Sequence, residues 1–287
     1  MLSILPNILI NTLVLASMYI LASLGFAFIF NMLGTINLAH GALYMLAAYI
    51  TFFLCSRLGF NSWLAMLCSC IILIALGVLL ERTCFRPFYD RFNRVIMISV
   101  ALMTILQTTS VLLTGSRNLI IPPFAAGIAD LGFMKIGREK FVTFSVGFVL
   151  LAITMFIVYR TKLGKQMAAV AQDRMGAALQ GIPIFRVSSL VFALGCALAA
   201  ISGSLMGAYQ QLSPYMGDNI QTRILMLVML AGAGSMNGII ITGIIMALAD
   251  SVFPVLFPGF VASALSVGVI IVLLLIRPKG FFGHEMA

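Results

Sequence analysis

The chain is built from long apolar runs, and the short segments between them carry most of its charge. A helix that crosses the hydrocarbon core of a bilayer needs about 20 mostly apolar residues, and eight runs come close to that length. They are roughly 6–30, 36–54, 62–80, 95–115, 141–159, 187–208, 224–249 and 260–276. Membrane-spanning strands would be shorter and would alternate apolar with polar positions. The pattern therefore predicts an all-α, polytopic transmembrane helix bundle of about eight spanning helices.

Small residues are dense within these runs, most of all at 195–207, where Gly195, Gly203 and Gly207 lie among alanines and serines. Such residues let helices approach closely in lipid, where packing replaces the hydrophobic effect. We therefore expect a compact bundle. No stretch has the composition of a soluble domain or a flexible linker, so we expect a single transmembrane domain over residues 1–287.

The composition fits a protein whose exterior is solvated by membrane lipid. Hydrophobic residues make up 62% of the chain and charged residues 9%, against about 25% charged in soluble domains. The net charge of +9 comes from basic residues in short loops. We read these as topology signals and expect no nucleic-acid partner. The five cysteines form neither a disulfide framework nor a metal-ligand pattern, so we expect them to be packing residues and expect no metal site.

The basic loops predict how the chain is oriented. Arginines and lysines gather at 81–94 and at 160–186, and such loops face the cytoplasm. The first basic residue is Arg57, so the N-terminus lacks the basic region of a signal peptide. The first run is therefore expected to remain as a span, with its N-terminal end outside.

The C-terminal end conflicts with a count of eight crossings. Eight crossings would leave the basic segment 277–280 outside, whereas basic segments favour the inside. One more crossing within 223–253 would remove the conflict, because glycines interrupt that run at 232–238. The sequence leaves open whether this interruption is a turn, a re-entrant hairpin or a kink.

Two interruptions, at 34–41 and 232–238, mark broken or re-entrant segments. Irregular backbone at membrane depth must face protein or a watery cavity, and transporters use broken helices at their substrate sites. The polar residues around the interruptions are therefore our candidates for a substrate pathway. They are Asn31, Asn37, His40, Tyr44, Ser235 and Asn237. The alternative is that these side chains only make hydrogen bonds between helices, or that the segments are turns at the membrane surface.

Two titratable side chains within the spans need separate interpretation. His40 has no carboxylate nearby in sequence, so a structural histidine is favoured over a proton relay. Asp250 is a candidate ion-coupling group. We favour a helix cap at the interface before Pro254.

The loop after Tyr159 has a helical centre, with Ala168, Met175 and Leu179 among the residues at helical spacing. Gly181 and the proline that follows at 183 are expected to end this helix. Such a helix suits docking into a groove of a partner or lying on the membrane surface. Composition does not separate the two.

Four segments, in order along nearly the whole chain, resemble one family, the LivH-type branched-chain amino acid permeases. The first is Ile36–Tyr49, which reads INLAHGALYMLAAY, and the second is Ala169–Arg174 continuing through Gly181 and Ile182. The third is the glycine-rich segment Gly232–Gly238, and the fourth is Arg277–Gly283, which reads RPKGFFG.

The resemblance implies partners and a coupling site that the residues alone do not. It implies a second, LivM-like permease or a second copy of this chain, two cytoplasmic ATPase subunits and an extracytoplasmic substrate-binding protein, all in or at the lipid membrane. The segment about 160–186 would be the coupling loop, with the coupling residues Gln172, Asp173, Arg174, Ala177 and Gly181. The wider Glu-Ala-Ala loop of ABC importers is matched only loosely, since Ala177-Ala178 has shifted spacing and no matching glutamate.

No P-loop occurs in the chain, so ATP-Mg is expected on the partner ATPases and no cofactor in this chain. Catalytic motifs are also absent, and we expect a transporter subunit and not an enzyme. The expected function is that of the permease of an ABC importer in the bacterial inner membrane, moving branched-chain or related amino acids by alternating access. The alternatives are a permease for urea or short amides in the same family and an ion-coupled secondary transporter.

Overall fold

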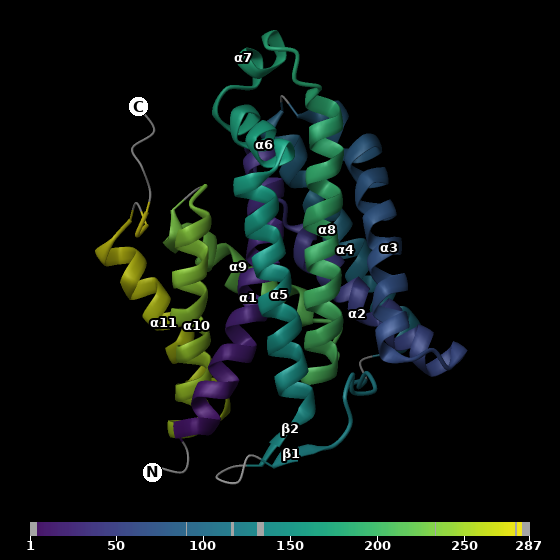
Figure 1. Cartoon of the computed structure of the whole chain (residues 1–287), viewed down its shortest axis with the longest axis vertical. Helices are drawn as coiled ribbons and strands as arrows, with labels where there is room; N and C mark the ends of the chain where they lie inside the picture. Colours follow the sequence, from purple (N-terminus) through teal and green to yellow (C-terminus); the bar gives the residue numbers. More distant parts are fainter. Residues whose placement is uncertain are drawn as a thin grey trace.

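The computed structural model describes residues 5–89, 91–115, 118–130, 135–232, 234–278 and 280–282. Its elements in chain order are α1 (Leu5–Leu33), α2 (Ala39–Leu58), α3 (Ser62–Leu80), η1 (Glu81–Phe85), η2 (Arg86–Phe88), α4 (Phe92–Thr114), β1 (Ile128–Asp130), β2 (Lys135–Gly137), α5 (Arg138–Arg160), α6 (Lys162–Gln172), α7 (Arg174–Leu179), α8 (Ile184–Tyr209), α9 (Met216–Ala231), α10 (Met236–Leu256) and α11 (Gly259–Ile276). Figure 1 shows the long helices running along one axis, with the short β1–β2 pair at one end. The predicted all-α bundle is confirmed.

The first helix, α1, forms the centre of the bundle. No charged residue occurs along its 29 residues, and most of its length from Val14 onward is buried. A helix that is apolar on all sides is stable only when it is surrounded by other elements. Accordingly, α5, α8, α9 and α10 all pack against α1.

Glycines bring α8 into close contact with its neighbours, as the small-residue pattern predicts. A Cβ placed on Gly195 would lie 2.8 Å from the carbonyl oxygen of Gly25 in α1, and a Cβ on Gly25 would lie 2.8 Å from the carbonyl oxygen of Gly195. A Cβ on Gly203 would collide with the backbone of Tyr44 in α2. The backbones of α1, α2 and α8 therefore meet where any larger residue would separate them.

Eight helices among the described residues are long and apolar enough to cross a membrane, as the sequence predicts. The predicted run 224–249, however, is wrong as a single span. It divides into the end of α9 and most of α10, and the chain turns between them at Gly232, where φ is 90°. The whole of α9 has 16 residues, about 24 Å at 1.5 Å per residue. That is shorter than the roughly 30 Å hydrocarbon core, so α9 is a partial crossing.

This partial crossing removes the conflict at the C-terminal end. α11 ends at the same end of the bundle as α6 and α7, and α1 begins at the opposite end (Figure 1). The Phe281 N–H donates to the Leu230 carbonyl and the Phe282 N–H to the Ala231 carbonyl, which ties the segment after α11 to the end of α9. The basic loops and the segment after α11 therefore share one face, as the positive-inside rule requires.

Candidate functional site

A cavity of about 770 Å³ lies at the end of the bundle that carries α6 and α7. Its walls come from α1, α5, α6, α8 and the start of α10. Three of the predicted pathway residues line it, namely Asn31, Ser235 and Asn237. Gln172, from the predicted coupling set, also lines it. The structure thus brings some members of both predicted sets to one space.

The two interrupted segments meet at this cavity, although about 200 residues separate them in sequence. Gly34 ends α1 with φ of 66°, and Gly234 precedes α10 with φ of 87°. Both glycines line the cavity. The Oδ1 of Asn31 lies 3.9 Å from the position that a Cβ on Gly234 would take. Irregular backbone from two parts of the chain therefore faces a cavity, the setting in which it is tolerated at membrane depth.

Ser235 starts α10 as its N-cap, since its Oγ accepts a hydrogen bond from the Gly238 N–H at 3.1 Å. We expect Ser235→Ala to lower the free energy of unfolding by about 1 kcal/mol, because one terminal N–H loses its acceptor. Ser235→Asp is the matched control, since aspartate also caps helices well. Detergent-micelle unfolding followed by circular dichroism measures the difference, and equal destabilisation by both substitutions would contradict the cap.

The other three predicted pathway residues, Asn37, His40 and Tyr44, lie outside this cavity and are all buried. Asn37 accepts a hydrogen bond from the Ala39 N–H at 3.1 Å and so shapes the start of α2. One ring nitrogen of His40 lies 3.1 Å from the carbonyl of Ala22. No carboxylate is bonded to His40 among the described residues, as expected for a structural histidine.

Asp250 does not cap a helix, so that expectation is wrong. It lies within α10, and Pro254 is also inside the helix. Its Oδ2 accepts hydrogen bonds from the Tyr19 hydroxyl at 2.8 Å and from Nη1 of Arg223 in α9. The Asp250 carboxylate is therefore neutralised within the bundle by an arginine that sequence reasoning placed at the edge of a run.

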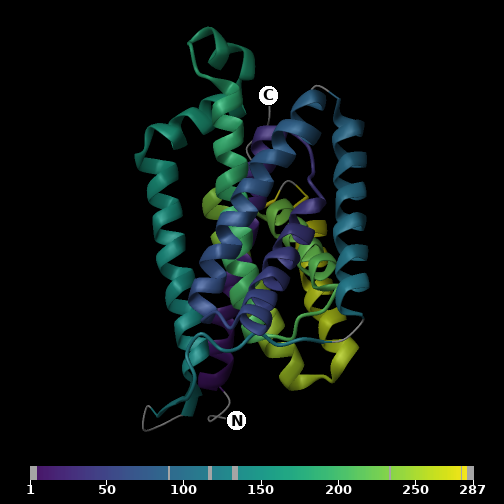
Figure 2. The same ribbon diagram turned by 90° about the vertical axis from the view of Figure 1, so that its right-hand side faces the viewer.

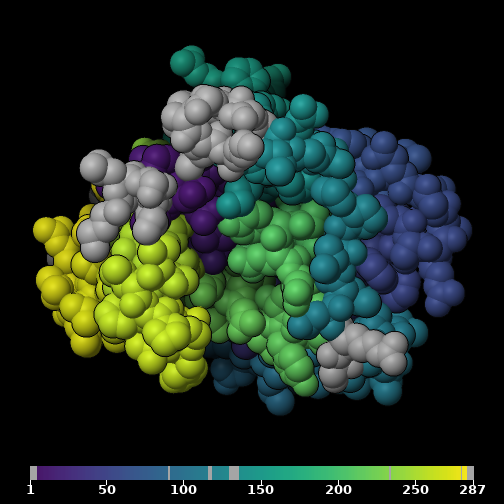
Figure 3. All heavy atoms as spheres, turned by 90° about the horizontal axis from the view of Figure 1, so that it is seen from below, coloured from purple at the N-terminus to yellow at the C-terminus, as the bar shows by residue number. Residues whose placement is uncertain are grey.

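A second, smaller cavity of about 140 Å³ is lined by Tyr44 and Arg223, together with residues of the α8–α9 connection. Figure 3 views the molecule from below, the end at which this connection lies, and draws this part of the chain in green. The two cavities share no lining residue among those described. Gln221 of α9 accepts a hydrogen bond from the Gly41 N–H of α2 at 2.7 Å and lines neither cavity.

The segment 160–186 forms two helices, α6 and α7, where the sequence predicts one. The break falls at Asp173, whose Oδ1 accepts the Met175 N–H at 3.0 Å and caps α7. The chain leaves α7 through Gly181, which has φ of 79°. α7 projects beyond the ends of the spanning helices in both views (Figures 1 and 2).

The side chains of α7 differ in exposure between the predicted coupling residue Ala177 and its apolar neighbours. Ala177 is 4% exposed and packs inward, whereas the apolar side chains of Met175 and Leu179 are 72% and 83% exposed. Apolar side chains so exposed at the tip of a projection favour contact with a partner. Ala177 thus packs α7 inward, while Met175 and Leu179 form its exposed apolar surface.

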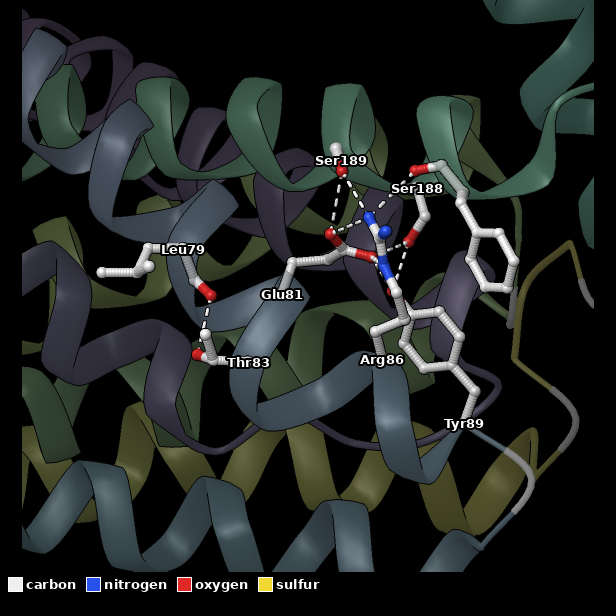
Figure 4. Close-up of polar contacts among 8 residues, drawn as sticks. Leu79, Glu81, Thr83, Arg86, Tyr89, Ser188 and Ser189 are labelled. Carbon is white, nitrogen blue, oxygen red and sulfur yellow. Dashed lines mark hydrogen bonds and ion pairs between the residues drawn. The ribbon is translucent and has the colours of Figure 1, made fainter.

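A buried carboxylate, Glu81, lies beside this loop (Figure 4). The predicted run 62–80 continues through η1 and η2, and Glu81 begins the π-helical turn. Arg86 donates to both carboxylate oxygens, at 3.0 and 2.7 Å. Ser188 and Ser189 of α8 donate to the same carboxylate, at 3.0 and 2.8 Å. This network fastens the end of α3 to the start of α8, directly after the 160–186 segment.

Tyr89 extends the network to α7. Its hydroxyl donates to Glu81 at 2.6 Å, and the guanidinium of Arg174 lies 4.6 Å from the centre of its ring. Burial raises the pKa of the Tyr89 phenol, so the neutral hydroxyl is available as a donor. Arg174, the first residue of α7, thus contacts the basic loop 81–94 through a cation–π interaction with Tyr89.

Sequence reasoning missed the roles of Glu81 and Arg223. Each is a charge at the edge of an apolar run, and a charge near a span calls for a partner. That signal was available for both residues. The identity of the partners was not, because Ser188 and Ser189 lie more than 100 positions from Glu81.

Residues 8–277 match a protein family described as the permease component of branched-chain amino acid transport systems. The high-affinity branched-chain amino acid transport system permease protein LivH of Salmonella typhimurium is 31% identical, covering 96% of this chain and 94% of that protein. BraD of Pseudomonas aeruginosa, a permease of the same description, is 30% identical over 96% of this chain and 95% of its own length.

More distant similarities extend to a second permease and a solved structure. LivM of Escherichia coli, another permease protein of such a system, is 24% identical and covers 93% of this chain and 68% of its own length. The solved structure of PsaBC from Streptococcus pneumoniae in complex with Fab is similar with a TM-score of 0.52 at 18% identity, covering 96% of this chain and 94% of that one. That likeness supports the fold alone.

Proposed function

We propose that this chain, which belongs to the family of permease components of branched-chain amino acid transport systems, is the membrane-spanning permease subunit of an ABC importer. It is a multi-pass protein of the bacterial inner membrane, and branched-chain amino acids are its proposed cargo. The family match over residues 8–277 carries the proposal. The chain acts as a transporter subunit and not as an enzyme.

Alternating access is supported by the two separate cavities. The larger cavity opens at the α6–α7 end and the smaller at the opposite end. This arrangement is expected for an inward-facing state, in which the larger cavity is open to the cytoplasm. Asn31, Ser235 and Asn237 would contact substrate in the inward-facing cavity. Asn37, His40 and Tyr44 would shape the segment that separates the cavities. A ligand shifts such an equilibrium only by binding its two states differently.

Coupling would occur through α6 and α7. Asp173 and Gly181 set the ends of α7, and Ala177 packs it inward, so Met175 and Leu179 are presented to a cytoplasmic ATPase. Arg174 contacts the other basic loop, and Gln172 lines the large cavity. Movement of α7 would thus reach the cavity directly. ATP-Mg would bind to two partner ATPases, and no cofactor to this chain.

The remaining proposed partners are a second permease and an extracytoplasmic substrate-binding protein. The similarity to both LivH and LivM supports pairing with a related permease, and a second copy of this chain is the alternative. The charge arrangement disfavours an ion-coupled secondary transporter, because Asp250 is paired with Arg223 and Glu81 with Arg86. The names of the relatives favour amino acids over urea or short amides.

Leu179→Asp tests the docking role of α7. We expect co-purification of the ATPase from native membranes to fall at least about 30-fold, because a charge would replace an apolar contact at the centre of an interface. Leu58→Asp is the matched control, since Leu58 is 62% exposed at the opposite end of the bundle. Undiminished ATPase recovery with Leu179→Asp would contradict the docking role.

A further inference from the structure

The small cavity has an arrangement of groups that suits one class of ligand. Polar side chains, those of Gln210, Gln211, Ser213 and Asn219, come from the α8–α9 connection and the start of α9. Arg223 and Tyr44 also line the cavity. The apolar part of the wall consists of Met206, Met216 and Ile220. One positive charge, a hydroxyl and an aliphatic wall thus surround the same space.

The Arg223–Asp250 ion pair still has hydrogen-bonding capacity. Among the described residues, the guanidinium donates only through Nη1, and the carboxylate accepts only at Oδ2. Three polar atoms make no hydrogen bond among the described residues, namely Nε and Nη2 of Arg223 and Oδ1 of Asp250. The Tyr19 ring lies 5.6 Å from the guanidinium carbon, which holds the guanidinium plane in place. Arg223 is 21% exposed and Asp250 8%, so the pair is accessible mainly from the Arg223 side.

One further group that lines the cavity, the Tyr44 hydroxyl, is without a partner among the described residues. The Tyr44 hydroxyl is buried and has no hydrogen-bond partner among the described residues, a state that costs about 1–3 kcal/mol. The Tyr44 hydroxyl is therefore a donor without a partner beside the same cavity that Arg223 lines.

We propose that this cavity binds the zwitterionic head group of a neutral aliphatic amino acid. The carboxylate accepts from Nε or Nη2 of Arg223 and from the Tyr44 hydroxyl. The ammonium is attracted by the Asp250 carboxylate, which is paired with Arg223 and does not itself line the cavity. The aliphatic side chain lies against Met206, Met216 and Ile220. The choice of an amino acid rests on the proposed function, and the head-group chemistry rests on the ion pair.

The charges and the size agree with this ligand. A zwitterion brings one charge of each sign to an ion pair of zero net charge, so no uncompensated charge is buried. Guanidinium is suited to carboxylate because its parallel N–H groups match the two oxygens. A cavity of about 150 Å³ holds a molecule the size of benzene. A space of about 140 Å³ therefore accepts the head group and first carbons of an amino acid.

The decisive variant is Arg223→Met combined with Asp250→Leu, in the complete transporter. Replacing a buried ion pair by apolar residues of similar volume is often neutral for stability. We therefore expect the unfolding midpoint and ATPase co-purification to stay at wild-type values while ATP-driven L-leucine uptake falls at least about tenfold. Lys140→Met is the control, because Lys140 lines neither cavity and bonds to Asn11. Wild-type uptake by the folded double variant would overturn the proposal.

Binding of radiolabelled L-leucine to the purified chain in lipid nanodiscs is the second test. Arg223→Lys retains the charge but not the planar fork of donors, and we expect the Kd for leucine to rise about tenfold. L-leucinamide, without the carboxylate, and 4-methylpentanoate, without the ammonium, should not compete. An unchanged Kd for Arg223→Lys, competition by either analogue, or no leucine binding by the wild-type chain would each overturn the head-group site.

The two proposals fail in different ways. Leucine binding by the wild-type chain without ATP-driven uptake would support the head-group site and overturn the proposed function. Leucine uptake that is unaffected in the double variant would support the function and overturn the site.

Discussion

Arg86→Met is expected to lower the free energy of unfolding by about 3–5 kcal/mol, because it leaves the fully buried Glu81 carboxylate without its countercharge. The hydroxyls of Tyr89, Ser188 and Ser189 remain as donors, but they carry no charge. Unfolding in mixed detergent and SDS micelles, followed by circular dichroism, measures the loss. This is the largest stability effect that we expect from any single substitution considered for this chain.

Two matched variants separate this explanation from a loss of packing. Glu81→Met should be less harmful, because the remaining Arg86 side chain is 27% exposed and can reach water. The double variant Glu81→Met with Arg86→Met should recover much of the stability lost in Arg86→Met alone. Additive losses in the double variant would contradict a buried ion pair as the cause.

Gly195→Leu is expected to destabilise the bundle by about 3 kcal/mol, at the upper end of the range for overpacking. The new Cβ would lie 2.8 Å from the Gly25 carbonyl oxygen, so α8 would have to move away from the central helix. Because rigid backbone forms the obstacle, side-chain rotation cannot relieve the clash. The same micelle unfolding assay, together with the yield of folded protein in membranes, measures the effect.

Gly268→Leu is the control for this substitution. Gly268 lies in α11, and no atom lies within 4 Å of the position that its Cβ would occupy. Leucine there should be neutral or slightly stabilising, since glycine is a poor helix residue. Equal effects of leucine at both glycines would show that helix propensity, and not the α1–α8 contact, decides the outcome.

Much of the fold can be predicted from hydropathy, because lipid obliges every crossing segment to be helical. Seven of the eight predicted runs correspond to single spanning helices, and the glycines of α8 correctly indicate close packing. The sequence located the interruption between α9 and α10 at 232–238, but it did not show whether this interruption is a turn, a re-entrant hairpin or a kink. Whether a glycine-rich segment kinks or reverses a helix depends on tertiary contacts, here the bonds from Phe281 and Phe282 to the end of α9.

The candidate site was only partly predictable. The polar residues around the two glycine interruptions were the predicted pathway candidates, and three of them, Asn31, Ser235 and Asn237, line one cavity. Nothing local to Arg223 or Asp250 indicates that they pair, since the contact depends on how α9 folds back beside α10. The interpretation of Asp250 as a cap failed for this reason. Helix caps are local features, whereas ion pairs between helices depend on the assembled bundle.

ATP-driven uptake of L-leucine into proteoliposomes tests the permease assignment most directly. The vesicles would hold this chain with its co-purified partners, and the binding protein and leucine would be supplied on the side opposite α7. We expect uptake that requires hydrolysable ATP on the α7 side and that Leu179→Asp abolishes. Leucine movement by this chain alone, without ATP or an ATPase, would contradict the assignment to an ABC importer.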